Sequence, residues 1–235
     1  MLPILWWCRR KDDPRAPRLL ILFVGYYLTS IWIILLPNAV DALWLGTWNW
    51  SGKLVAMAFS LLFYLATRHL YPEHRYINLR PAPGWIRTLG LVALSVLLGA
   101  VALAVLDYYI LRTLFDWQAV STEELYFQLI VPGWSEEIEY RGVQLGLLMA
   151  ALRPIQLTEG GLRIYPAIWI TGLLFGTAHG FYIMDDWTFY FDWVEIAMST
   201  VLSGAFFAWM TVRSGSIFTP VMIHTAIFFI VALLA

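Results

Sequence analysis

The chain has 235 residues, of which 60% are hydrophobic and only 13% are charged, and its mean hydropathy is +0.69. A soluble domain carries about 25% charged residues, so this composition excludes an ordinary soluble protein and is typical of an integral membrane protein. The formal net charge of −1 argues against a nucleic-acid-binding protein, which needs a basic face, and the single Cys8 excludes an intramolecular disulfide.

Apolar segments follow one another along the whole chain. At about 20 residues per spanning helix, they predict about seven spans, at roughly 19–36, 52–67, 88–111, 127–152, 165–184, 194–212 and 216–235. The loops between these segments are short. We therefore expect a single integral-membrane domain over residues 1–235, folded as an all-α polytopic transmembrane bundle.

Basic residues gather in alternate loops of this predicted topology. A basic run at residues 9–11 precedes the first span, which is long enough to cross a membrane and is not followed by a small-residue cleavage site. Most of the other Lys and Arg residues fall on the same predicted side, whereas the opposite loops contain only Lys53 and Arg112. The positive-inside rule then predicts a cytoplasmic N-terminus.

A few ionisable side chains lie inside the apolar segments. They are Glu136, Glu137 and Arg141 in SEEIEYRG, His179 in LLFGTAHG, and His224 in VMIHTAIFF. An ionisable group in the hydrocarbon layer costs about 3 kcal/mol or more on insertion scales, so it persists where it is paired, lines a wet cavity or takes part in function. Two acids, one Arg and two His on three predicted spans form a set that can activate water.

The acidic motif combines a predicted ion pair with a second carboxylate. Glu137 and Arg141 are one helical turn apart, in the order that favours pairing. Glu136 points about 100° away from Glu137 on an α-helix, so it can face a cavity as a general acid or base while Arg141 holds its neighbour. Glu139 and Tyr140 follow and could support the site. The alternative from these residues alone is a structural Glu–Arg pair with a spare Glu.

Two series of small residues accompany the polar motifs. They are Gly172, Gly176 and Gly180 beside His179, and Gly142 and Gly146 beside the acidic motif. Such spacing lets helix backbones approach closely in lipid, so we expect the fourth and fifth spans to pack tightly and to bring His179 near Glu136. The alternative for His179, and equally for His224, is a polar residue that bonds a neighbouring helix.

The motifs also occur in a recognisable order. They read EExxxR at Glu136, Glu137 and Arg141, then FxxxH at Phe175 and His179, then a later His, His224, on the last span. Over roughly residues 120–235 this order resembles the CPBP family, the CAAX-processing and bacteriocin-processing group of intramembrane endopeptidases that is also called Abi. The resemblance implies that the motif-bearing core is a glutamic-type intramembrane protease.

The resemblance also implies a role for each motif residue. Glu136 and His179 would activate water, Arg141 would hold Glu137, and His224 would help to stabilise the oxyanion.

One position departs from the family pattern. The family's last motif usually reads HxxxN or HxxxD, whereas residue 228 is Phe. The amide or carboxyl donor is therefore missing there; Tyr140, Thr177 and Thr225 are candidate substitutes, and the alternative is that His224 suffices alone.

We expect no cofactor. Two His and a Glu could also hold zinc, and the family was once described as metalloproteases, so zinc stays an alternative. The sequence lacks an HExxH pair on one helix, which favours metal-free glutamate chemistry.

The expected partners are the lipid bilayer and a membrane-anchored or exported protein or peptide, and no nucleic acid. With the N-terminus inside, the motifs lie toward the outer face, which fits a bacterial inner-membrane enzyme that processes C-terminal sorting signals better than one that trims cytosolic CaaX tails. The alternative functions are a non-catalytic family member that acts as a scaffold or immunity factor, and a proton-coupled membrane binding protein.

Overall fold

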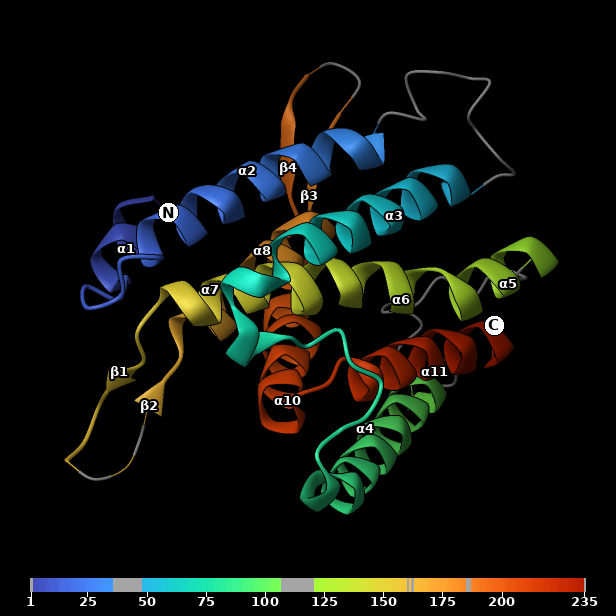
Figure 1. The fold of residues 1–235 in the computed structure, drawn as a ribbon. Helices are drawn as coiled ribbons and strands as arrows, with labels where there is room; N and C mark the ends of the chain where they lie inside the picture. The colour runs from blue at the N-terminus through green and yellow to red at the C-terminus, as the bar shows by residue number, and fades with distance from the viewer. Residues whose placement is uncertain are drawn as a thin grey trace.

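The computed structural model describes residues 2–35, 48–106, 121–159, 161, 163–184 and 187–234. Helices dominate this part of the chain (Figure 1). The N-terminal half contains α1 (Leu2–Cys8), α2 (Ala16–Leu35), α3 (Trp50–Thr67), the short 3-10 turns η3 (Arg68–Leu70), η4 (Pro72–His74) and η5 (Pro83–Trp85), and α4 (Ile86–Leu106). The C-terminal half contains α5 (Thr122–Ile130), α6 (Pro132–Glu136), the π-helix η7 (Glu137–Gln144), α7 (Leu145–Ala151), α8 (Pro166–Gly180), α9 (Trp193–Met198), the π-helix η8 (Ser199–Ala205), α10 (Phe206–Ser214) and α11 (Phe218–Leu234).

Helices occupy most of each of the seven predicted apolar ranges, although the ends of the first, third and seventh ranges lie outside the described residues. Within the described residues, three helices are long and apolar enough to cross a membrane: Ala16–Ile34, Trp50–Leu70 and Trp193–Ser214. A shorter apolar helix covers Phe218–Ile227. The helical membrane protein is therefore confirmed, while the number of spans and the cytoplasmic N-terminus stay predictions.

Two small β-hairpins, which the sequence did not predict, accompany the helices. Strand β1 (Ile155–Gln156) pairs with β2 (Arg163–Ile164), and β3 (Phe181–Ile183) pairs with β4 (Phe189–Phe191), both antiparallel. The second hairpin replaces the end of the predicted span 165–184, because α8 ends at Gly180. Aromatic cross-strand pairs, which stabilise antiparallel strands, explain the change: the Phe181 and Phe191 ring centroids are 5.0 Å apart.

Side-chain caps fix where several helices begin. Asn49 accepts a hydrogen bond from the backbone N–H of Gly52 at 2.9 Å, and this cap starts α3 at Trp50. Ser121 accepts from the N–H of Glu124 at 3.1 Å at the start of α5. These caps determine which residues lie in the first turn of each helix. The first of them places Lys53 in the first turn of α3.

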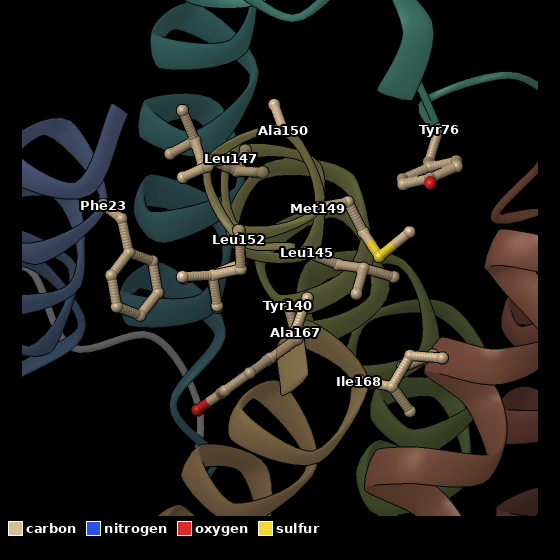
Figure 2. Packing of buried hydrophobic residues seen from close by; sticks show 14 of the residues in the cluster. Phe23, Tyr76, Tyr140, Leu145, Leu147, Met149, Ala150, Leu152, Ala167 and Ile168 are labelled. Atoms are coloured by element: carbon tan, nitrogen blue, oxygen red, sulfur yellow. The ribbon is translucent and has the colours of Figure 1, made fainter. Parts of the chain in front are cut away.

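The hydrophobic core surrounds α7, which is buried along its whole length. Figure 2 shows Phe23 of α2 on one side of this helix and Ala167 and Ile168 of α8 on another, with Tyr76 nearby. In Figure 1, α2 and α3 lie beside the long helical run α5–α7, and α4 lies beside α11. The π-helix η7, which carries most of the acidic motif, contributes Ile138, Tyr140 and Val143 to the same core, so core packing holds the motif in place.

The glycine series pack against different neighbours from those predicted. The series at 172, 176 and 180 meets α9 and η8, because a Cβ atom on Gly172 would lie 2.8 Å from the Ala205 backbone nitrogen. Gly142 and Gly146 face Ile77 and the His74 carbonyl, respectively. The fourth and fifth predicted spans do contact each other, through α8 with η7 and α7, and His179 lies near Glu136. The expectation that these glycines form that contact is wrong, because small residues permit close approach without specifying the partner.

Replacing Gly176 by Ala should destabilise the protein by about 1–3 kcal/mol, the usual cost of overpacking. A Cβ atom there would lie 2.5 Å from the Ile196 carbonyl oxygen, a backbone atom that cannot rotate away. Gly25→Ala is the matched control, since a Cβ atom there meets nothing within 4 Å. Thermal unfolding followed by tryptophan fluorescence would measure both, and equal midpoints would contradict the prediction.

Candidate functional site

The two acids sit where α6 passes into the π-helix η7. Glu136 is the last residue of α6 and Glu137 is the first of η7. The π pattern is visible at the far end, where the N–H of Leu145 donates to the Tyr140 carbonyl five residues back. Glu136 is 7% exposed and Glu137 is 0% exposed. Such local π segments are frequent at functional sites.

Arg141 holds Glu137, as the spacing predicts. Its Nε lies 3.3 Å from Glu137 Oε2, and both side chains are fully buried. Its Nη2 donates to the Ser203 carbonyl at 2.6 Å, and the guanidinium stacks 4.4 Å above the Phe175 ring centroid. Arg141 therefore connects η7 with η8 and α8, in addition to neutralising Glu137.

His179 comes from the last turn of α8 and faces Glu136. Its Nε2 lies 3.8 Å from Glu136 Oε2. Its Nδ1 lies 2.8 Å from the carbonyl oxygen of Phe175, and the two rings pack at an interplanar angle of 30° with centroids 4.3 Å apart. The position and orientation of the imidazole are thus set by the FxxxH spacing.

His224 comes from α11 and reaches both acids. Its Nε2 lies 3.7 Å from Glu136 Oε2, and its Nδ1 lies 3.0 Å from Glu137 Oε1. The side chain is 4% exposed. The structure therefore brings Glu136, His179 and His224 together, with two imidazole Nε2 atoms directed at one carboxylate oxygen. Among the described residues, that oxygen accepts no direct hydrogen bond.

Lys53 is the site residue that the sequence pattern did not reveal. The topology placed it in an outer loop, but it lies in the first turn of α3, with its Nζ 2.5 Å from Glu136 Oε1. The available signal was its position: it is the one basic residue of the apolar segment that follows the tryptophan-rich stretch ending at Trp50. The sequence could not show that α3 packs against α6.

The residues considered as substitutes for the missing donor differ in their packing and hydrogen bonding. Tyr140 is buried and its ring meets Phe175 edge to face, with centroids 5.2 Å apart. The Thr177 hydroxyl donates back to the Leu173 carbonyl at 2.9 Å, so it is engaged by its own helix. Thr225 Oγ1 is buried and has no hydrogen-bond partner in the described part of the chain. The side chain of Phe228 lies outside the described residues.

The positions of the acidic and imidazole side chains decide whether they could form a zinc site. Within the residues that the structure describes, no cluster of three or more His, Cys, Asp or Glu side chains has a metal-binding arrangement. Metal independence stays a prediction.

A cavity of about 850 Å³ lies elsewhere, at a site lined by Trp85, Tyr165, Trp209 and Arg213 among others. None of the acids or histidines described above lines it. The acid–imidazole cluster and this cavity are therefore two separate sites.

The comparisons with known proteins agree with the motifs. A family model described as "Type II CAAX prenyl endopeptidase Rce1-like" matches residues 118–230. No curated protein and no solved structure matches the chain. The matched range contains both acids, Arg141 and both histidines, whereas Lys53 lies before it. The match over residues 118–230 therefore confirms the resemblance to the CAAX-processing endopeptidase family that the motifs indicate.

Proposed function

We propose that this protein is an intramembrane endopeptidase that hydrolyses a peptide bond of a membrane-anchored or exported protein, with water activated by Glu136 and His179. The observation that carries the proposal is the convergence of the His179 and His224 Nε2 atoms on Glu136 Oε2, at 3.8 and 3.7 Å. The match to the family model over residues 118–230 supports peptidase activity independently of this geometry.

The hydrogen bonding of His179 assigns its tautomer. Its Nδ1 faces a backbone carbonyl oxygen, which can only accept, so Nδ1 carries the proton. In the neutral ring, Nε2 is then an acceptor, as is the ionised Glu136 carboxylate. Two acceptors 3.8 Å apart cannot bond to each other, but one water can donate a hydrogen to each. This is the position proposed for the attacking water.

The reaction follows from this placement. Glu136 or His179 accepts one proton of the water while the oxygen forms a bond to the scissile carbonyl carbon. The carbonyl π electrons move to its oxygen and give a tetrahedral oxyanion. The C–N bond then breaks, and the protonated acceptor returns its proton to the leaving amine. Water is consumed, and no covalent enzyme intermediate forms.

His224 is the proposed oxyanion donor. Its Nδ1 faces a carboxylate oxygen of Glu137 and donates to it. In the imidazolium form, Nε2–H remains to stabilise the negative oxygen of the tetrahedral intermediate. The Glu137–Arg141 pair would then act through His224, by fixing the orientation of its ring.

The placement of the residues supports a site that opens outward. Lys53 lies at the start of α3, Glu136 lies in the first half of the predicted span 127–152, and His179 lies at the end of α8. With the proposed cytoplasmic N-terminus, all of these positions fall toward the outer face. We therefore propose a C-terminal sorting signal or another exported membrane protein as the substrate, in a bacterial inner membrane, in preference to a cytosolic prenylated tail.

Hydrolysis in water enriched with ¹⁸O tests the proposal on a whole mixture of candidate substrates. The reconstituted protein is incubated with membrane protein extract, and new C-termini are identified by mass spectrometry. We expect C-termini that carry one ¹⁸O atom with the wild-type protein and not with Glu136→Gln. Identical sets of C-termini in the two samples would contradict a peptidase and favour a scaffold or binding protein.

Treatment with a strong chelator should leave the cleavage rate within about twofold of its untreated value. The reason is that the proposed water is placed by a carboxylate and an imidazole, and HExxH is absent from the sequence. The measurement is the rate before and after chelation, with elemental analysis of the same sample. Stoichiometric zinc, with activity lost on its removal and restored on its return, would contradict the prediction.

A further inference from the structure

Lys53 gives the site a cation that neither the motifs nor the family match includes. Its ammonium lies 2.5 Å from Glu136 Oε1, and its side chain is 20% exposed. The chain has only one other lysine, Lys11, which is exposed near the N-terminus. Lys53 is the single charged residue of α3, and its contact with a buried carboxylate points to a role in the site.

The two oxygens of Glu136 have different surroundings. Oε1 faces the ammonium, whereas Oε2 faces the two imidazoles. A carboxylate held at one oxygen cannot exchange its two oxygens by rotation without breaking the ion pair. The ammonium therefore determines which oxygen is presented to His179 and His224.

The neighbouring acid has the same arrangement with a different cation. Glu137 faces Arg141 through Oε2 and His224 through Oε1. Each of the two adjacent carboxylates thus has a basic side chain on one oxygen and an imidazole on the other. The parallel indicates that Lys53 neutralises and orients the Glu136 carboxylate, as Arg141 neutralises and orients that of Glu137.

We infer that Lys53 is a positioning residue for the water-activating carboxylate: it supplies the counter-charge of Glu136 and holds Oε2 toward the histidines. This inference rests on the proposed function. It adds α3, a helix outside the family-matched range, to the machinery of the site. Lys53 acts through Glu136 and does not itself contact the substrate.

Steady-state kinetics test the inference, with a reporter peptide taken from a cut site found by ¹⁸O labelling. Lys53→Met should lower kcat by about 100-fold, the usual consequence of misplacing a reacting group, and leave KM within about twofold. Lys53→Arg should recover part of the rate. Lys11→Met is the matched control and should leave both constants unchanged.

A double-mutant cycle separates positioning from a structural role. In the Glu136→Gln background, Lys53→Met should lower the residual rate no further, because the carboxylate it orients is gone. An equal loss in both backgrounds would overturn the inference, as would a wild-type kcat for Lys53→Met when Glu136→Gln is inactive. A fully active Glu136→Gln would instead refute the proposed function itself.

If Lys53→Met folds poorly, the inference can be tested by rebuilding the amine chemically on a folded variant. Lys53→Cys is prepared in a Cys8→Ala background, which leaves a single thiol. Alkylation with bromoethylamine rebuilds a lysine-like ammonium, whereas iodoacetamide adds a neutral group. We expect the ammonium to restore at least tenfold in kcat over the neutral adduct of the same polypeptide. Equal rates for the two adducts would overturn the inference.

Discussion

Glu136→Gln should reduce kcat/KM by about 10³–10⁴-fold, the upper part of the range for loss of a general base. The amide is isosteric with the carboxylate, but it cannot accept the proton of the attacking water. With its amide oxygen accepting from Lys53, it presents N–H₂ to the histidines, so it no longer orders a water that donates to two acceptors. The measurement is cleavage of the reporter peptide at matched protein levels in proteoliposomes.

The control for this change is Glu159→Gln, which makes the same substitution at an exposed position outside the site. It should retain the wild-type rate. The folded state of Glu136→Gln should survive, since the amide oxygen can still accept from Lys53, and its thermal midpoint serves as the check. A normal rate in Glu136→Gln would exclude this residue as the base.

Arg141→Ala should lower the free energy of unfolding by about 3–5 kcal/mol, the usual cost of removing one partner of a buried ion pair. Both side chains are 0% exposed, so Glu137 would be left as an unpaired buried charge. The Ser203 carbonyl would also lose its 2.6 Å hydrogen bond, and Phe175 its stacked cation. Thermal or denaturant unfolding in detergent, together with expression yield, would measure the loss.

Two further variants isolate the charge from the packing. Arg141→Lys keeps the charge but not the planar fork that donates and stacks, so it should recover only part of the stability. Glu137→Gln combined with Arg141→Ala should be more stable than Arg141→Ala alone, because no unpaired carboxylate remains. The exposed Arg87→Ala controls for loss of an arginine. Wild-type stability of Arg141→Ala would contradict the buried pair.

Short-range patterns predicted much of the site. The i, i+4 spacing predicted the pair of Glu137 with Arg141, and the cost of burying charge predicted that Glu136, His179 and His224 converge. These inferences succeed because they depend on residues of one helix or on the bilayer as a solvent.

The unpredicted features depend on tertiary contacts. The two glycine series indicated close packing but not the partners, which are α9 and η8 for the series beside His179 and the segment around His74 and Ile77 for the other. Lys53 was missed because its role depends on where α3 begins and on which helix it meets. The β3–β4 hairpin was missed because an apolar run of aromatic residues fits a spanning helix and a strand equally well.

The π-helix η7 makes the site sensitive to the length of the chain as well as to its composition. A hydrogen bond to the fifth residue back, like that of Leu145 with Tyr140, accommodates one residue more per turn than an α-helix. If the segment closed as an ordinary α-helix with all its residues retained, everything before it would rotate by about 100° relative to the core helix α7. The chain would keep its hydrophobicity and its helix, while Glu136 would turn away from both histidines. Deleting one residue between Glu137 and Gln144 at the same time would restore the original facing, because the extra residue of the wide turn would be gone. Among related sequences, a one-residue gap aligned to this stretch should therefore mark proteins in which the segment is an ordinary α-helix and the site is kept.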